Sequence, residues 1–233
     1  MLKIRPANER GRNSPSIPWL TSYHTFSFAD YYDPKHIHFS HLRVMNEDII
    51  APRQGFGMHP HNDMEILTYV LSGSVAHQDS MGNRTQLNAG EFQIMSAGTG
   101  IFHSEVNPSA EQDLHLYQIW ILPKLKGIEP RYEQGKFADQ EGATLILSPT
   151  PDDNAFYVNQ DMRLWRWQLS LAKSAVQNIE ISPQRRYWLQ MVKGKLNVNG
   201  MPLNTGDGLA ITEEEALHLE LLDDSEFLFF DLV

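Results

Sequence analysis

The chain has 233 residues, of which 41% are hydrophobic, and its 19 basic and 29 acidic side chains give a formal net charge of −10. This length is enough for one large β domain or two smaller ones, each with its own core. The negative charge and the lack of any long run of Lys or Arg exclude direct nucleic-acid binding, because such binding depends on neutralising phosphates. The chain has no cysteine, which excludes disulfides, thiolate metal sites and cysteine nucleophiles.

The first ten residues contain no apolar segment of the kind that begins a signal peptide. Nowhere in the chain is there a run that approaches the roughly 20 apolar residues of a membrane span. We therefore expect a cytoplasmic protein that does not contact membranes.

Segments typical of β-strands alternate with turn signals along the whole chain. In the first half we expect strands at 19–28, 38–45, 65–71, 74–79, 92–95 and 114–122. From Lys124 to about Gln140 the apolar residues no longer recur at strand spacing, and this segment is the candidate linker. In the second half we expect strands at 144–147, 163–169, 187–192, 196–198 and 226–232. Short strands with frequent turns and little helical periodicity indicate an all-β sandwich or barrel.

Two pieces of the first half recur in the second half. The segment around Gly73 resembles that around Gly194, 121 residues later, and the segment around Gly90 resembles that around Gly206, 116 residues later. Such self-similarity predicts two related domains in tandem. We expect an N-terminal barrel at residues 1–130 and a C-terminal barrel at 131–233.

Four side chains that can bind a metal lie in two pairs, His59 with His61 and His103 with Glu105. Residues i and i+2 of a strand point to the same face. If the two strands face each other inside a small barrel, the four groups converge and suit a divalent first-row metal. A lone His-x-His is usually a chance occurrence, and Pro60 fits a plain loop as well as an edge strand at a barrel mouth. The two pairs together, flanked by glycines, favour the metal site.

The second half of the chain has no matching set of ligands. A shift of 121 residues places Glu180 and Ser182 where His59 and His61 would fall. Only His218 and Glu220 stand near the places of His103 and Glu105. We expect these two side chains to point outward from an alternating strand at 216–222, so that the second barrel has no complete metal site.

The segments that contain these ligands resemble the signatures of the cupin superfamily. They are His59-Pro-His-Asn-Asp-Met-Glu65, the later Gly73 and Gly90, and the segment from Ser96 to Asn107. Within the cupins, essentially the whole chain resembles the pirin family, in particular the bacterial pirin-like quercetin 2,3-dioxygenases. The resemblance implies a bicupin, two tandem antiparallel β-barrels of the double-stranded β-helix or jelly-roll type. It also implies a metal in the N-terminal barrel only, with Glu105 as the carboxylate ligand and Glu65 near the site or lining its cavity.

The resemblance further implies a metal-dependent dioxygenase that cleaves the heterocyclic ring of quercetin-like flavonols with O2 and releases carbon monoxide. The metal would acidify the substrate hydroxyl, and Glu105 would accept its proton as the catalytic base. The cofactor is one divalent metal ion; Fe(II) is favoured, with Zn, Co, Ni, Cu and Mn as alternatives because this ligand set accepts several metals. Phe56 and Phe102 are candidate contacts for the flavonoid rings, and His24 and His115 are candidate neighbours of the ligands.

Two other functions remain open. A pirin can be a metal-binding protein without enzymatic activity that regulates a partner protein or senses redox state. A cupin of this kind can also be an isomerase or a storage protein without oxygen chemistry. Turnover of quercetin by the metal-loaded protein distinguishes the dioxygenase from both.

Overall fold

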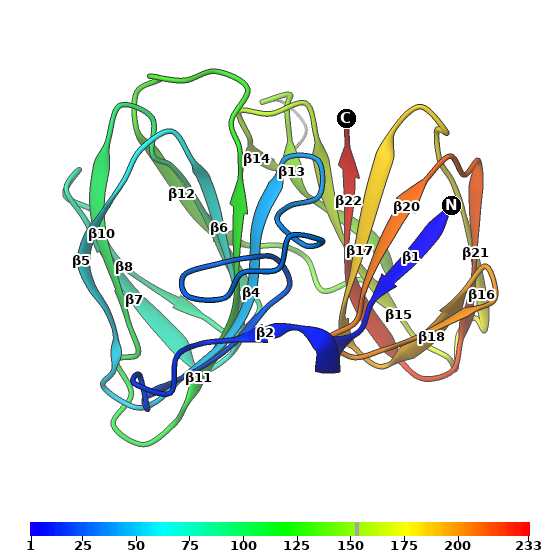
Figure 1. Ribbon diagram of the computed structural model, residues 1–233, viewed down its shortest axis with the longest axis horizontal. Coiled ribbons are helices and arrows are strands. Elements are labelled where there is room, and N and C mark those ends of the chain that lie inside the picture. Colours follow the sequence, from blue (N-terminus) through cyan, green and yellow to red (C-terminus); the bar gives the residue numbers. More distant parts are fainter. Residues whose placement is uncertain (152–153) are drawn as a thin grey trace. The chain divides into compact units, whose positions relative to one another are not determined.

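The computed structural model describes residues 1–151 and 154–233, and its strands form two compact units (Figure 1). One unit comprises Gly11–Phe137, and the other comprises Met1–Arg10 together with Ala138–Val233. Apart from the short 3-10 helix Ala7–Glu9, the regular elements of the described residues are β-strands. Within these residues no helix is long and apolar enough to cross a membrane. The prediction of an all-β protein with two barrels is confirmed.

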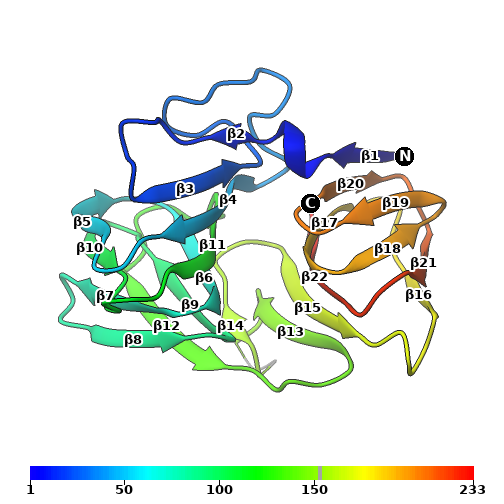
Figure 2. The same ribbon diagram turned by 90° about the horizontal axis from the view of Figure 1, so that it is seen from below.

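The first unit is built from eleven strands in two sheets. They are β2 (Gly11–Arg12), β3 (Leu20–His24), β4 (Leu42–Ile50), β5 (Gly55–His61), β6 (Glu65–Ser72), β7 (Ser74–Asp79), β8 (Arg84–Asn88), β9 (Glu91–Ser96), β10 (Ile101–Val106), β11 (Leu114–Ile121) and β12 (Arg131–Lys136). The larger sheet has the order β12-β9-β6-β11-β4-β3-β2, and the smaller has the order β5-β10-β7-β8. Figure 2 shows these strands surrounding the interior of one barrel.

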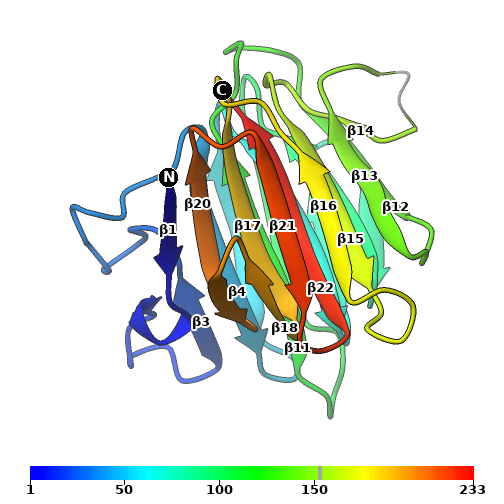
Figure 3. The same ribbon diagram turned by 90° about the vertical axis from the view of Figure 1, so that its right-hand side faces the viewer.

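The second unit repeats this arrangement. Its strands are β1 (Leu2–Arg5), β13 (Gly142–Ser148), β14 (Phe156–Tyr157), β15 (Arg163–Leu169), β16 (Val176–Glu180), β17 (Arg186–Lys193), β18 (Lys195–Val198), β19 (Met201–Asn204), β20 (Gly208–Thr212), β21 (Ala216–Leu221) and β22 (Ser225–Leu232). The sheets have the orders β1-β20-β17-β22-β15-β13-β14 and β16-β21-β18-β19. The neighbours β1, β20, β17, β22 and β15 can be followed in Figure 3.

The two units divide at different residues from those expected. The segment 124–140, expected to be a linker, contains β12, which pairs with β9 at the edge of the first unit's larger sheet. Strand β12 is polar and charged, as edge strands often are, and this composition hid it from the apolar pattern. At the other end of the chain, β1 pairs with β20 and becomes the edge strand of the second unit. The first unit therefore runs to Phe137 and begins only at Gly11.

The interior of the first barrel is layered. One apolar cluster consists of Leu20, Ile50, Val70, Val75, Leu87, Leu114 and Leu116, and another of Ile66, Met95, Ala97 and Ile101. On β6, Thr68 lies between Ile66 of one cluster and Val70 of the other, and it points to the same face because side chains alternate along a strand. Thr68 pairs with Gln93 on one side and Gln118 on the other. The barrel therefore encloses a polar layer between two apolar ones.

The second barrel has the same pairing, but in the part that the structure describes apolar side chains take the place of this polar layer. Leu189 takes the place of Thr68, since it pairs with Leu209 and Phe229 on the corresponding neighbouring strands. All three belong to one apolar core that extends through the barrel. Buried polar groups are costly unless they bond to one another, so the polar layer of the first barrel marks where a function can lie.

Candidate metal centre

The first pair of predicted ligands lies on β5, an edge strand of the smaller sheet. His59 and His61 point to one face, and their ring centroids are 4.9 Å apart. Pro60, between them, is exposed. Because proline has no N–H to give to a ladder, it is tolerated on an edge strand. The expected same-face pair on an irregular edge strand is present.

The second pair lies on β10, directly beside β5. His103 pairs with His59 in the strand register, and its ring centroid is 4.5 Å from that of His59 and 4.8 Å from that of His61. The two strands are hydrogen-bonded neighbours within one sheet and do not face each other across the barrel. A register irregularity between His103 and Glu105 accompanies the pairing with β5. The convergence of the three imidazoles comes from adjacency in the sheet.

His103 is the most enclosed of the three histidines. It is buried, and neither of its ring nitrogens has a hydrogen-bond partner. Burial, together with the nearby His59 and His77, lowers the pKa of His103 to about 3. Burial and the same clustering of imidazoles lower the pKa of His61 to about 4. Both rings are therefore neutral near pH 7 and keep a lone pair, which is the state that binds metals.

His59 is oriented by its own strand. Its Nδ1 lies 2.7 Å from the carbonyl oxygen of Gly57, which can only accept a hydrogen bond, so this contact selects the tautomer with the proton on Nδ1 and leaves Nε2 as the potential ligand atom. The potential ligand atoms of His59, His61 and His103 all lie within 4.8 Å of one another. Two metal–nitrogen bonds of ~2.1 Å span at most about 4.2 Å. A slight contraction of these rings would therefore surround a divalent metal, so the donor set fits such an ion.

The carboxylate of Glu105 is buried and held by side-chain donors of the polar layer. Gln93 Nε2 donates to Oε1 at 2.5 Å, and Gln118 Nε2 donates to Oε2 at 2.6 Å. The Thr68 hydroxyl lies 3.1 Å from Oε1. Hydrogen bonds of this kind fix the direction of a ligand's lone pairs and are typical of the surroundings of metal ligands.

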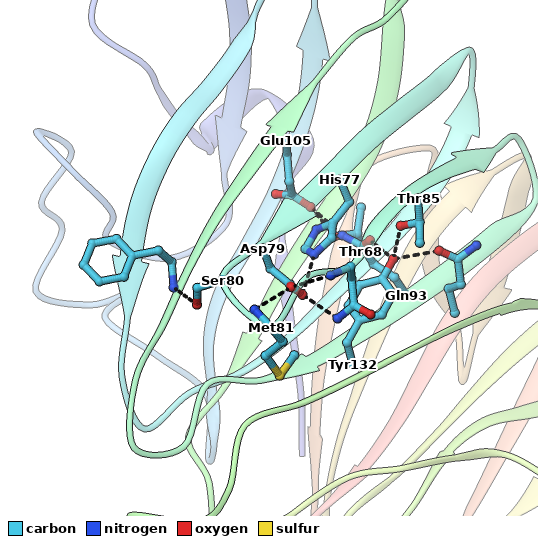
Figure 4. A network of polar contacts seen from close by, with 12 residues as sticks. Thr68, His77, Asp79, Ser80, Met81, Thr85, Gln93, Glu105 and Tyr132 are labelled. Atoms are coloured by element: carbon cyan, nitrogen blue, oxygen red, sulfur yellow. Dashed lines mark hydrogen bonds and ion pairs between the residues drawn. The ribbon is translucent and has the colours of Figure 1, made fainter.

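The amide of Gln93 is oriented in turn by Tyr132, as Figure 4 shows. The Tyr132 hydroxyl donates to Gln93 Oε1 at 2.9 Å, so that the amide nitrogen faces Glu105. Tyr132 lies on β12, inside the segment expected to be a linker. Sequence patterns did not reveal that this strand supports the site.

Glu65, the other carboxylate considered, is placed elsewhere. It is adjacent to Ile66 on β6 and so faces away from the barrel interior. Its Oε2 accepts a hydrogen bond of 2.9 Å from Ser96 and lies 3.7 Å from a guanidinium nitrogen of Arg131. It belongs to neither group of potential ligand atoms that lie within 4.8 Å of one another, whereas Glu105 belongs to one of them. The geometry thus supports the preference for Glu105.

His77 is a neighbour of the site that the sequence analysis missed. The ligand atoms of His77, His103 and Glu105 form a second group within 4.8 Å, so the four predicted ligands belong to two overlapping groups that share His103. His77 Nε2 lies 3.2 Å from Asp79 Oδ2, and its ring stacks on Tyr132 with centroids 4.5 Å apart. Figure 4 shows this arrangement. The spacing His77-x-Asp79 on a strand was a signal that could have been noticed.

Among the aromatic side chains, Trp120 lies nearest the predicted ligands. Its ring meets that of His61 edge to face, with centroids 4.8 Å apart. Phe56 meets the ring of His59 edge to face, with centroids 6.4 Å apart, and it also contacts Trp19 and packs against the apolar core. Phe102 is 53% exposed and adjacent in sequence to His103, so that it points out of the barrel. Trp120 and Phe56 therefore both lie beside the histidines of β5, the first next to His61 and the second next to His59.

The two histidines expected beside the ligands are placed differently from each other. His24 is buried on the inward face of β3, where burial lowers its pKa to about 4. His115 bonds to Glu47 at 2.9 Å, and it lies on the face of β11 opposite to Gln118. His115 is therefore outside the polar layer.

A second carboxylate is buried in the polar layer. Asp48 lies on β4, and burial raises its pKa to about 7, with Ser22 opposing that shift and the charge of Glu105 adding to it. Its Oδ1 has no hydrogen-bond partner. The interior of the first barrel thus carries more polar groups than its own hydrogen bonds satisfy.

Among its described residues, the second barrel has no equivalent ligand set. His218 and Glu220 are each 51% exposed, as predicted for outward positions of an alternating strand. When Gly73 is matched to Gly194, strand pairing aligns Glu105 with Leu219 instead. Continuing along the paired strands, the positions of His59, His61, His103 and Glu105 are taken by Ile179, Ile181, Leu217 and Leu219. The shift of 121 residues had matched His59 and His61 to Glu180 and Ser182. Each of these lies one residue after the position that strand pairing gives.

Comparison with known proteins places this fold and site in a family. Residues 4–121 match the model of the pirin family, and residues 145–232 match that of the quercetinase C-terminal cupin domain. A protein of Pasteurella multocida is 71% identical over the full length of both chains. The quercetin 2,3-dioxygenase of Escherichia coli K12 is 56% identical over 100% of this chain and 99% of its own. The chain belongs to the pirin family of the cupin superfamily, and it is a bicupin.

Solved structures agree with this assignment. The crystal structure of the Escherichia coli pirin YhhW in complex with nickel(II) has a TM-score of 0.94, is 56% identical, and is matched over 100% of this chain and 99% of that one. A quercetin 2,3-dioxygenase of Acinetobacter baumannii has a TM-score of 0.74 at 21% identity, matching 91% of this chain and 80% of that one. The similarity to the Acinetobacter protein concerns the fold alone. The structure of YhhW is that of a close relative with a divalent metal bound.

Proposed function

We propose that this protein is a metal-dependent dioxygenase that cleaves the heterocyclic ring of quercetin-like flavonols with O2. The observation that supports this most directly is the convergence of three imidazoles, with the pKa of His61 and His103 lowered, beside a buried carboxylate in the polar layer of the first barrel. The similarity to enzymes named quercetin 2,3-dioxygenase over the full length of the chain supports the substrate class.

The residues that would hold the metal are His59, His61, His103 and Glu105. A divalent ion bound there would supply Lewis acidity toward a substrate hydroxyl and a site for oxygen chemistry. The protein contributes the orientation of the ligands, through Gly57 for His59 and through the two glutamine amides for Glu105. Preformed ligands of this kind reduce the cost of ordering the site when the metal binds.

The substrate would approach from the side of β5. His59 and His61 are half-buried, whereas His103 and Glu105 are buried, so the histidine pair of β5 is the part of the site most accessible to solvent. An aromatic substrate there would meet the ring of Trp120 beside His61. The carboxylate of Glu105 would accept the proton of the flavonol hydroxyl, because one of its oxygens lies within 4.8 Å of a ring nitrogen of His103.

Proton removal makes the flavonol electron-rich and prepares it for reaction with O2. Ring cleavage then places both oxygen atoms of O2 in the products, which are a depside and carbon monoxide. We propose Fe(II) as the metal, with Zn, Co, Ni, Cu and Mn as alternatives, since three imidazoles and one carboxylate accept several divalent ions. The nickel(II) complex of the relative YhhW is in keeping with this breadth.

Reconstitution tests the proposal directly. The metal-free protein is loaded separately with Fe(II), Co(II), Ni(II), Cu(II) or Mn(II), and quercetin is added in air-saturated buffer. We expect loss of the near-ultraviolet band of quercetin with equimolar oxygen uptake and carbon monoxide release for at least one metal. Tight metal binding without turnover by any of them would reject the dioxygenase and favour a regulatory metal-binding pirin.

A further inference from the structure

The second barrel contains a cavity at the position that corresponds to the metal centre of the first. The cavity has a volume of about 230 Å3 and is lined in part by Ile179 and Ile181. These are the residues that strand pairing aligns with His59 and His61. The second barrel therefore has a cavity where the first barrel has its potential ligands, and the two residues at the positions of His59 and His61 are apolar.

The other walls of this cavity are largely aromatic. They include Trp165 and Trp167 on β15, Tyr187 on β17 and Phe229 on β22. Trp165 and Phe229 are paired in the strand register, with ring centroids 6.4 Å apart. Both tryptophans are only partly buried, so the protein's own packing leaves part of their surface uncovered. Ring surface of this kind favours contact with a planar aromatic ligand.

The charged groups that line the cavity are both carboxylates, those of Asp231 and Glu180. Arg185 bonds through Nε to Asp231 Oδ1, which balances the charge of Asp231 and leaves Oδ2 able to accept a hydrogen bond. Glu180 is exposed, so water screens its charge. A ligand in this cavity is therefore expected to offer a hydrogen-bond donor and to carry no negative charge.

The size of the cavity restricts the ligand further. Drug-sized ligands occupy pockets of roughly 300–1,000 Å3, and this cavity is smaller. One or two fused rings match it better than the three rings of a flavonol.

We propose that the second barrel binds a small uncharged phenol, with its ring against Trp165 and Phe229 and its hydroxyl donating to Asp231. This binding requires no metal, so it stands independently of the catalytic proposal for the first barrel. It also gives the second cupin domain a binding function, although its described residues do not repeat the metal ligands of the first barrel.

Titration of the full-length protein with 2-naphthol, followed by the indole N–H signals of its five tryptophans, tests the proposal. Signals are assigned by Trp→Phe variants. We expect saturable shifts of Trp165 and Trp167, with no shift of Trp120 at the same concentrations. We also expect at least tenfold weaker binding of 2-naphthoate. Shifts confined to Trp120, absence of saturation, or tighter binding of 2-naphthylmethylammonium than of 2-naphthol would each overturn the proposal.

Two variants on one strand segment provide a matched comparison. Ile181→Phe fills the cavity and should weaken 2-naphthol binding at least tenfold. Val176→Phe adds the same ring at a position on β16 that is 43% exposed and outside the cavity, and it should bind as the parent does. Equal binding by both variants would overturn the proposal.

Discussion

The side-chain amide of Gln118 donates a hydrogen bond of 2.6 Å to Oε2 of Glu105. Gln118 lies on β11 in the larger sheet of the first barrel, and Glu105 lies on β10 in the smaller sheet. The contact therefore joins the two sheets across the barrel interior. It holds the carboxylate that we propose as the fourth metal ligand, and it does so from the polar layer between two apolar clusters.

Removal of this amide should weaken metal binding while leaving the four ligands in place. Gln118→Leu deprives Glu105 Oε2 of its donor, and loss of such a supporting hydrogen bond typically costs 10–100-fold in metal affinity. We expect a loss in this range for Fe(II) or Ni(II), measured by competition with a coloured chelator. The control Gln78→Leu makes the same change at an exposed position of β7 and should leave the affinity within about twofold. Equal affinities for the two variants would show that the Gln118 contact does not support the metal.

Replacing individual ligands tests which residues hold the metal. His61→Ala and Glu105→Ala should each abolish metal retention and quercetin turnover. His218→Ala, which removes an outward-facing imidazole of the second barrel, should change neither. Metal content by atomic emission and oxygen uptake provide the two measurements. Full metal occupancy in Glu105→Ala would show that the carboxylate ligand is another residue.

His77 requires a separate test, because it forms the second cluster with His103 and Glu105. Its Nε2 is engaged with Asp79 and its ring stacks on Tyr132, so we expect it to be no ligand. His77→Phe keeps a ring for the stack and removes both nitrogens. This variant should retain one metal ion per chain. Loss of the metal comparable to that in His61→Ala would instead assign His77 to the coordination sphere.

Features that depend on neighbouring residues could be predicted from the sequence, and features that depend on the whole barrel could not. The spacing of His59 and His61, and of His103 and Glu105, predicted two same-face pairs because alternation along a strand depends on neighbouring residues alone. That β5 and β10 are adjacent in one sheet could not be predicted, because strand order and register depend on the whole barrel. For the same reason His77 and Gln93 were missed as neighbours of Glu105. The repeat predicted two barrels, but the pairing of β1 with β20 had no signal in the pattern.

The backbone approach between β5 and β10 provides a further prediction. A Cβ atom at Gly55 would lie 2.3 Å from the carbonyl oxygen of Glu105, whereas a Cβ atom at Gly57 would meet nothing within 4 Å. Gly55→Ala must therefore push apart the strands that carry His59 and Glu105. We expect a loss of about 2–3 kcal/mol in the free energy of unfolding, since overpacking typically costs ~1–3 kcal/mol, and weaker metal binding.

Gly57→Ala, on the same strand, is the matched control. It should change the free energy of unfolding by less than about 1 kcal/mol and retain the metal. Chemical denaturation of the metal-free proteins and chelator competition measure the two effects. Similar stability and affinity for both variants would mean that the close contact at Gly55 is not needed to position the ligands.

Asp48 should make the stability of the metal-free protein depend on pH. Its pKa is about 7 in the folded protein and 3.8 in the unfolded chain. Between these values the folded state holds the proton that the unfolded state has released, so the free energy of unfolding falls as pH rises from about 4 to 7 on account of this residue. Asp48→Asn keeps the shape and removes the titration. The variant should therefore gain stability relative to the parent across this range, by up to about 4 kcal/mol above pH 7.

The buried histidines of the first barrel change the free energy of unfolding with pH in the opposite direction to Asp48. Their effect is the same in the parent and in Asp48→Asn. His24, with a folded pKa of about 4, is protonated more readily in the unfolded chain, so its contribution to stability is lost as pH falls from about 6.5 to 4. Subtracting the unfolding free energies of parent and variant at each pH cancels this contribution and leaves that of Asp48. A difference that stays constant between pH 4 and 8 would mean that Asp48 titrates normally. A difference that shrinks on metal loading would show that the bound cation stabilises the ionised carboxylate, as expected for a charge that lies within the field of the site.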